Sequence, residues 1–124
     1  MSILIVVPTA LIYGIPSILS NFLDIQVHSV DLSNLLKSIM CLYLGVSLVW
    51  VLGIWKIAYW QIATQLNILF MFSLALGRSL SLMNDGFPTM GYVFGILAEF
   101  GLGLYSIYQL KKYSIKLYPN QKVN

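Results

Sequence analysis

The stretch ILIVVPTALIYGIPSILSNFL occupies residues 3–23 and contains no charged side chain. As a single α-helix, a run of this length would cross the roughly 30 Å of hydrocarbon in a bilayer. A signal peptide would need a basic region before the run and a small-residue cleavage site after it, and neither is visible. Pro8 and Pro16 interrupt the run. We therefore expect a membrane-spanning helix that is kinked or locally unwound at the prolines.

Three further apolar stretches follow, at about residues 32–54, 61–82 and 88–110. Asp31 is placed to cap the first of them, and Pro88 suits the first turn of the last. Asn84-Asp85-Gly86 is a turn signature between the last two. Residues 111–124 form a polar tail. The sequence predicts an all-α chain: one transmembrane domain over residues 1–124, folded as an integral membrane four-helix bundle.

The composition supports a membrane protein. Hydrophobic residues make up 59% of the 124 residues and charged residues only 9%, whereas a soluble domain carries about 25% charged residues. The net charge is +3, but much of the basic charge lies in the tail, at Lys111, Lys112, Lys116 and Lys122. A basic tail without interleaved aromatic residues is weak support for nucleic-acid binding, so we expect no nucleic-acid partner.

The distribution of lysine predicts the orientation in the membrane. Lys56 and the lysine tail fall on one side of a four-span chain, together with the N-terminus. The links that contain His28 and Asp85 fall on the other side and have no Lys or Arg. The positive-inside rule then places both termini in the cytoplasm, as in a multi-pass protein of the cell inner membrane.

Three ionisable side chains fall inside the predicted spans: Lys37, Arg78 and Glu99. A charge that faces lipid is costly, so these side chains should face the bundle interior. From the helical rise, Lys37 and Arg78 lie about 8 and 6 Å below the outer surface, and Glu99 lies about 16 Å below it. The axial difference of about 10 Å between Arg78 and Glu99 is within reach of two long side chains. We predict a polar cluster of these three residues that opens outward past Asp85.

The helical faces are consistent with that cluster. The third predicted span carries four polar residues on one stripe, Asn67, Arg78, Ser81 and Asp85. The fourth carries Glu99 in register with Gly91, Gly95 and Gly103, at intervals of four residues. Small residues at this spacing allow close helix packing, within the chain or at a homodimer interface.

Structural interpretations of the same residues remain open. An Arg78–Glu99 pair can simply fasten two helices together. Asp85 can serve only to shape the turn and cap the last helix. The side chain of Lys37 can extend to the outer headgroups without reaching the cluster.

Few residues are suited to metal binding or catalysis. The chain has one cysteine, Cys41, and one histidine, His28. These make no zinc-binding set, and no Ser-His-Asp, Cys-His or paired-carboxylate arrangement is visible. We therefore expect no metal, no cofactor and no catalytic residue, and an enzyme is the least favoured class.

Residues 77–88 read GRSLSLMNDGFP. This stretch resembles the signature of a family of small four-span bacterial membrane proteins known only as domain of unknown function 4345. The matching positions are Arg78, Ser81, Asp85, Gly86 and Pro88, with Glu99 in the next span and Tyr13-Gly14 and Pro16 in the first. A looser likeness in size and layout is to DoxX-type four-helix proteins. The resemblance implies the four-span fold and marks these residues, but it implies no activity.

Three functions compete at this point. The first is binding of a lipid-like or other hydrophobic small molecule in an outward-facing intramembrane pocket, with Arg78 and Glu99 fixing its polar end. The second is a small proton-coupled transporter, which at this size would act as a homodimer. The third is a structural or assembly subunit of a membrane complex, with its glycine face packed on a partner.

Overall fold

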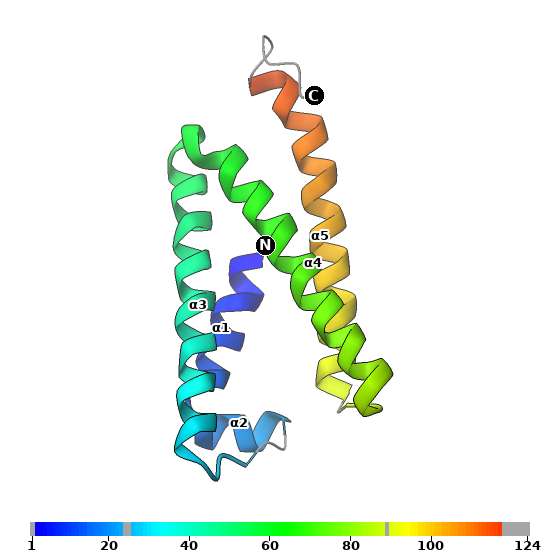
Figure 1. The fold of residues 1–124 in the computed structure, drawn as a ribbon. Helices are drawn as coiled ribbons and strands as arrows, with labels where there is room; N and C mark the ends of the chain where they lie inside the picture. The colour runs from blue at the N-terminus through cyan, green and yellow to red at the C-terminus, as the bar shows by residue number, and fades with distance from the viewer. Residues whose placement is uncertain (1, 24–25, 89, 118–124) are drawn as a thin grey trace.

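In a computed structural model, the backbone is described for residues 2–23, 26–88 and 90–117, and this part of the chain consists of helices and short links without any strand. The elements in chain order are α1 (Ser2–Gly14), α2 (Pro16–Leu23), α3 (Val30–Trp55), the short 3₁₀ helix η1 (Ile57–Tyr59), α4 (Trp60–Asp85) and α5 (Met90–Leu117). Figure 1 shows α3 and α4 joined through η1 at one end of the bundle, which we call the upper end, and diverging toward the lower end.

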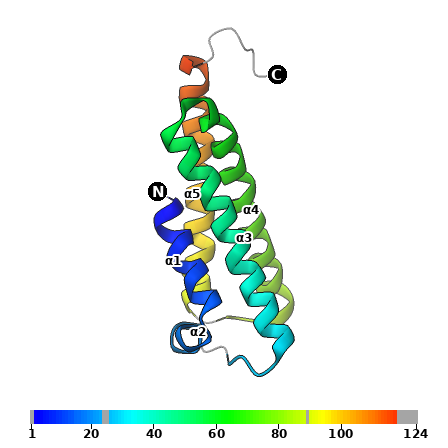
Figure 2. The ribbon, with the colours of Figure 1, turned by 90° about the vertical axis from the view of Figure 1, so that its left-hand side faces the viewer.

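The first apolar run forms two helices, so the interruption expected at the prolines occurs at Pro16, and the run does not cross the bundle as a single helix over residues 3–23. α1 ends at Gly14 and α2 begins at Pro16. Proline disfavours a helical conformation in the residue before it and suits the first position of a new helix, and both effects act at Ile15-Pro16. α2 lies across the lower end of the bundle in two views (Figures 1 and 2). Pro8, by contrast, is accommodated inside α1.

Among the described residues, three helices are long and apolar enough to cross a membrane: Val30–Trp55, Ile57–Asp85 and Met90–Tyr113. α1 has 13 residues and is therefore about 20 Å long, shorter than a hydrocarbon core. It begins near half the height of the bundle and runs to the lower end (Figures 1 and 2). Large apolar side chains such as Leu48, Leu69 and Leu97 point outward, each about two-thirds exposed. A soluble bundle would bury such residues, whereas a membrane bundle presents them to lipid.

The helices pack in sequence: α1 along α3, α3 on α4, and α4 on α5. Glycines permit two close approaches, because a Cβ at Gly14 would meet Met40 and one at Gly53 would meet Ala63. Trp50 is buried against Phe70, with their ring centres 5.6 Å apart. α1 has few close backbone approaches to α4 and α5, so the bundle is loosely packed along that side.

The ends of the helices differ from the sequence-based predictions in three places. Ser29, not Asp31, caps α3, since its Oγ accepts a hydrogen bond from the Leu32 N–H at 3.1 Å. Pro88 precedes α5 and lies outside its first turn. α5 continues to Leu117, so the predicted polar tail is helical at its start, and residues 118–124 lie outside the described part. Gly86 adopts φ 98° after α4, a conformation that favours glycine.

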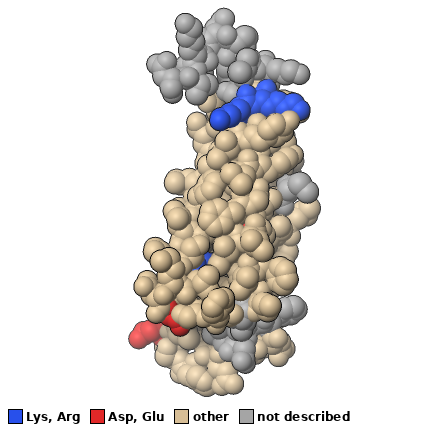
Figure 3. All heavy atoms as spheres, turned by 90° about the vertical axis from the view of Figure 1, so that its right-hand side faces the viewer, with Lys and Arg blue, Asp and Glu red and all other residues tan. Residues whose placement is uncertain are grey.

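On one face of the molecule, the exposed charged side chains gather toward the two ends. In Figure 3, basic side chains form a band near the upper end, acidic ones lie toward the lower end, and the flank between them is almost free of charge. Such a flank suits the hydrocarbon layer of a bilayer.

Candidate intramembrane binding site

A cavity of about 350 Å³ lies between α1, α4 and α5 in the lower half of the bundle, with Tyr43 of α3 in its wall. We call it the lower cavity. Its lining is Ile5, Val6, Thr9, Ile12, Tyr13, Tyr43, Met71, Leu74, Arg78, Gly91, Tyr92, Phe94, Gly95, Ala98, Glu99 and Leu102. The wall is mostly apolar and contains one basic and one acidic side chain. The cavity follows from the loose contact of α1 with α4 and α5.

Arg78 and Glu99 form an ion pair across the α4–α5 contact. Nη2 of Arg78 lies 3.2 Å from Oε1 of Glu99, and both side chains are largely buried. The guanidinium also lies over the ring of Tyr92, 5.4 Å from its centre, in a cation–π contact. α4 and α5 therefore hold a neutral pair of charges at the cavity wall, where neither charge faces lipid.

Gly95 makes room for this arrangement. A Cβ at Gly95 would collide with Nη1 of Arg78, so the arginine lies directly against the α5 backbone. Gly103 likewise permits a close approach of α4, because a Cβ there would come 2.9 Å from the ring of Phe72. Gly91 lines the lower cavity. Side chains of the same chain thus cover two of the three glycines, and a homodimer through them stays a prediction.

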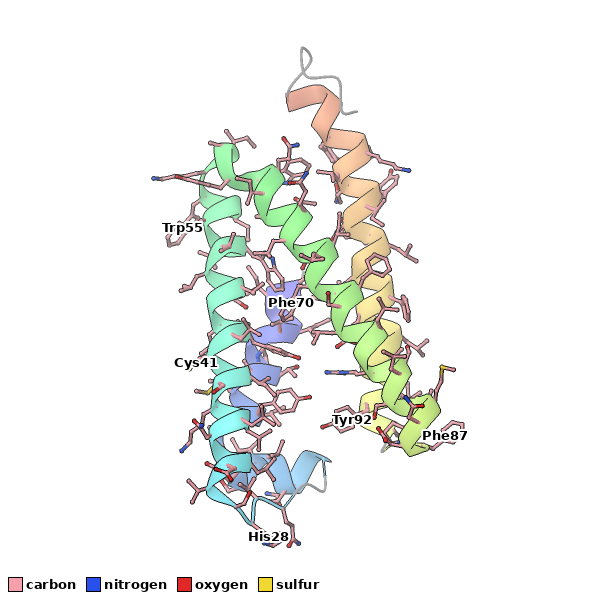
Figure 4. The ribbon with its side chains drawn as sticks, in the orientation of Figure 1. His28, Cys41, Trp55, Phe70, Phe87 and Tyr92 are labelled. Atoms are coloured by element: carbon pink, nitrogen blue, oxygen red, sulfur yellow. The ribbon has the colours of Figure 1, made fainter. Side chains whose placement is uncertain are left out.

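Three tyrosines surround the pair, and reasoning from the sequence did not assign them to the site. Tyr13, Tyr43 and Tyr92 come from α1, α3 and α5 and all line the cavity. The rings of Tyr13 and Tyr43 meet edge to face with centres 5.9 Å apart, and Tyr92 points from α5 into the space beside α1 (Figure 4). One signal was available: Tyr43 lies near the middle of a predicted span, whereas tyrosines in membrane helices usually lie near the interfaces.

The site keeps hydrogen-bonding capacity after the ion pair has formed. Oε2 of Glu99 is buried and has no hydrogen-bond partner among the described residues. A guanidinium carries five N–H donors, and within the described ranges the contact of Arg78 with Oε1 is its one ion pair. Together with the tyrosine hydroxyls, these groups can fix one polar end of a guest whose remainder contacts apolar wall.

The other predicted site residues lie elsewhere. Lys37 is exposed on α3 and forms no ion pair within the described part of the chain. Ser81 donates a hydrogen bond to Asp85 at 2.8 Å on the exposed end of α4. Asn67 is buried and donates to Ser106 at 2.5 Å, outside the lower cavity. Of the predicted cluster, the structure brings together only Arg78 and Glu99, because the depth of a residue in one helix does not fix which neighbouring helix it faces.

No group of three or more His, Cys, Asp or Glu side chains that could hold a metal ion occurs among the residues that the structure describes. Cys41 is exposed on the outer face of α3, and His28 lies at the lower end of the bundle (Figure 4). Neither residue contributes to the lower cavity.

Comparison with known proteins gives one match. The family model described as "Domain of unknown function (DUF4345)" matches residues 1–110, which include every residue of the lower cavity. No curated protein and no solved structure matches the chain, so the likeness to DoxX-type proteins gains no support. The chain belongs to the DUF4345 family.

Proposed function

We propose that this member of the DUF4345 family binds a lipid-like or other hydrophobic small molecule in the lower cavity, with Arg78 and Glu99 fixing its polar end. The observation that carries the proposal is a mostly apolar cavity whose described wall holds a single buried ion pair. A volume of about 350 Å³ falls at the lower end of the range typical of small-molecule sites.

The position of the polar groups also supports an amphiphilic guest. Arg78, Glu99 and Tyr92 lie on one side of the cavity, whereas Ile5, Val6 and other aliphatic residues of α1 line the opposite side. Residues at the edge, such as Phe94 and Ile5, are exposed at the surface of the bundle. A molecule dissolved in the membrane could therefore enter from the side, between α1 and α5.

The placement in the membrane is part of the proposal. α1 would be the fourth membrane segment beside the three long helices, and the upper end with Lys56 and Lys111 would face the cytoplasm of an inner-membrane protein. The beginning of α1 points toward that end, as an N-in and C-in arrangement requires. The lower cavity would then lie in the outer half of the bilayer.

Thermal unfolding in mild detergent tests the binding. The probes are palmitic acid, hexadecanol and monopalmitoylglycerol, which share one chain and differ in the polar end. A ligand at one hundred times its Kd stabilises the folded state by about 2.7 kcal/mol, so at least one probe should raise the Tm of the wild type. Arg78→Gln, Glu99→Gln and Thr9→Phe, which fills the cavity, should remove this shift.

Lys37→Gln is the matched control, because it removes an intramembrane charge outside the cavity, and it should leave the shift unchanged. Co-purified lipids, identified by mass spectrometry, give a second readout for the same variants. Unchanged shifts and unchanged lipids in Arg78→Gln, Glu99→Gln and Thr9→Phe would rule out binding in this cavity.

A proton-coupled transporter is the second candidate. The observation that favours it is Oε2 of Glu99, a buried carboxylate oxygen without a partner among the described residues, since intramembrane carboxylates often carry protons in transporters. Proteoliposomes with an imposed pH gradient would show proton flux that Glu99→Gln abolishes. Equal flux in wild type and Glu99→Gln would eliminate this candidate.

A further inference from the structure

The ion pair leaves the lower cavity without net charge. Arg78 and Glu99 are the one basic and the one acidic side chain of the described wall. Nη2 of Arg78 lies 3.2 Å from Oε1 of Glu99, so each charge is compensated within the wall itself. A guest with a net charge would bring one charge more, in surroundings where little water screens it.

A charged head on the guest would meet a like charge at either partner. The guanidinium is small and planar, so an anionic head that accepts hydrogen bonds from Arg78 also comes close to the carboxylate of Glu99. Two negative charges repel each other strongly at short distance in a low dielectric. A cationic head bound to Glu99 would be repelled by Arg78 for the same reason. The pair therefore disfavours anionic and cationic amphiphiles alike.

The acidic partner needs a hydrogen-bond donor from the guest. Oε2 of Glu99 is buried and has no hydrogen-bond partner among the described residues, and the whole residue is only 7% exposed. Buried polar atoms are normally paired, and a carboxylate oxygen can only accept a hydrogen bond. A head made of an ester or an ether has no donor and would leave Oε2 unpaired.

The basic partner needs a hydrogen-bond acceptor. The guanidinium of Arg78 lies over the ring of Tyr92, and its Nη1 lies against the backbone at Gly95. It has five N–H donors and no acceptor, so a group that pairs with it must accept. A hydroxyl group is the smallest neutral head that donates one hydrogen bond and accepts another.

The size of the cavity favours a guest with one chain. Its volume of about 350 Å³ is at the lower end of the range for small-molecule sites, which suits a small head and part of a single chain. Ile5 and Phe94 line the cavity and are also exposed at the surface of the bundle. The rest of the chain can pass between them into the lipid.

We propose that the lower cavity selects a neutral, single-chain lipid with a hydroxyl head, such as a long-chain alcohol or a monoacylglycerol. The hydroxyl group donates to Oε2 of Glu99 and accepts from Arg78, and the chain lies against the aliphatic residues of α1. Fatty-acid anions, phospholipids and long-chain cations are excluded by charge or by size. This inference rests on the proposed function, because it names the class of ligand that the same site takes.

Four probes with one chain length test the selectivity by thermal unfolding in mild detergent, each at a low mole fraction of the detergent. Hexadecanol donates and accepts, hexadecyl methyl ether only accepts, hexadecane-1-sulfonate is a permanent anion, and hexadecyltrimethylammonium is a permanent cation. From the dependence of Tm on probe concentration, the wild type should bind hexadecanol about tenfold more tightly than the ether, which leaves Oε2 unpaired. Both charged probes should bind more weakly than hexadecanol by at least the same factor.

Charge variants should reverse this order. Glu99→Gln leaves the positive charge of Arg78 uncompensated, so it should lose the hexadecanol shift and bind the sulfonate most tightly. Arg78→Gln should bind the trimethylammonium probe most tightly. Thr9→Phe, which fills the cavity, should lose the shift with every probe, whereas Lys37→Gln should keep the order of the wild type. If the two charge variants do not fold, the order of the four probes in the wild type decides.

The outcomes separate this inference from the proposed function. Equal binding of hexadecanol and the ether by the wild type would overturn the inference, since the guest would then not pair with Oε2. Tightest binding of the sulfonate would also overturn it, because Arg78 would then act as a free cation. In either case, a shift that Thr9→Phe abolishes would leave the proposed function standing. No shift with any probe would overturn both.

Discussion

The buried charges of Arg78 and Glu99 are each stable in the protein interior only because the other compensates them. The two side chains lie at a cavity wall with low solvent exposure, where removal of one charge leaves the other without compensation. Breaking a buried pair in this way is usually much more costly than replacing both partners. The same physics holds whether the pair binds a ligand or only fastens α4 to α5, so stability and binding must be measured separately.

We expect Arg78→Gln and Glu99→Gln each to lower the free energy of unfolding by about 3–5 kcal/mol, because each leaves one buried charge unpaired. The double variant should lose less than the sum of the two. Denaturant unfolding in lipid micelles, arranged as a double-mutant cycle, measures the coupling. Additive losses would mean that the two side chains do not interact in the membrane.

Gly95 gives a second test at the residue scale. Gly95→Ala should displace the Arg78 side chain and weaken the pair, for a net loss of about 1–2 kcal/mol after the gain in helix propensity. Gly101→Ala on the same helix is the control, since a Cβ there meets nothing within 4 Å, and it should be neutral or stabilising by up to about 1 kcal/mol. Thermal unfolding of the two variants side by side checks the difference. Equal effects would show that Arg78 does not lie against Gly95.

At the scale of elements, the helix ends were the least predictable features. Asp31 has the residue type and position of a cap, but Ser29 provides the cap because α3 begins two residues earlier, at Val30. Asp31 instead lies in the first turn, where its charge interacts favourably with the helix dipole. The break at Ile15-Pro16 was visible in the sequence as a proline, but the direction in which α2 leaves α1 was not.

Ser29→Ala should therefore destabilise the protein by about 1 kcal/mol, through loss of the hydrogen bond to the Leu32 N–H. Asp31→Ala should cost less, about 0.3–0.5 kcal/mol, and this smaller loss should decrease at high salt. Thermal unfolding at two ionic strengths measures both effects. A larger, salt-independent loss for Asp31→Ala would identify Asp31 as the cap.

At the scale of the whole molecule, the distribution of charge sets the expected orientation. On the face that Figure 3 shows, basic side chains gather near the upper end and acidic ones toward the lower end, with an apolar flank between. The lower cavity lies against α4 and α5 between these ends.

Cysteine labelling of intact cells tests this orientation. In a Cys41→Ser background, His28→Cys at the lower end should react with a membrane-impermeant maleimide from outside, while Lys111→Cys should react only after permeabilisation, because positively charged ends stay in the cytoplasm. The Cys41→Ser chain without an added cysteine is the blank. The reverse labelling pattern would invert the proposed topology and move the lower cavity to the cytoplasmic leaflet.

The sequence by itself determined the helical class and the three long apolar helices, and it placed Arg78 and Glu99 within reach of each other without excluding Lys37 as the partner. Apolar length and the shortage of charge fix the first two, since only helices satisfy their own backbone hydrogen bonds in lipid. Helical period and depth brought Arg78 and Glu99 within reach of each other. Only the tertiary structure separated Lys37, Ser81, Asp85 and Asn67 from that pair, and added Tyr13, Tyr43 and Tyr92 to it. The physical reason is that period and rise fix the face and depth of a residue on its own helix, while its partners depend on which helices pack together and on where α1 ends.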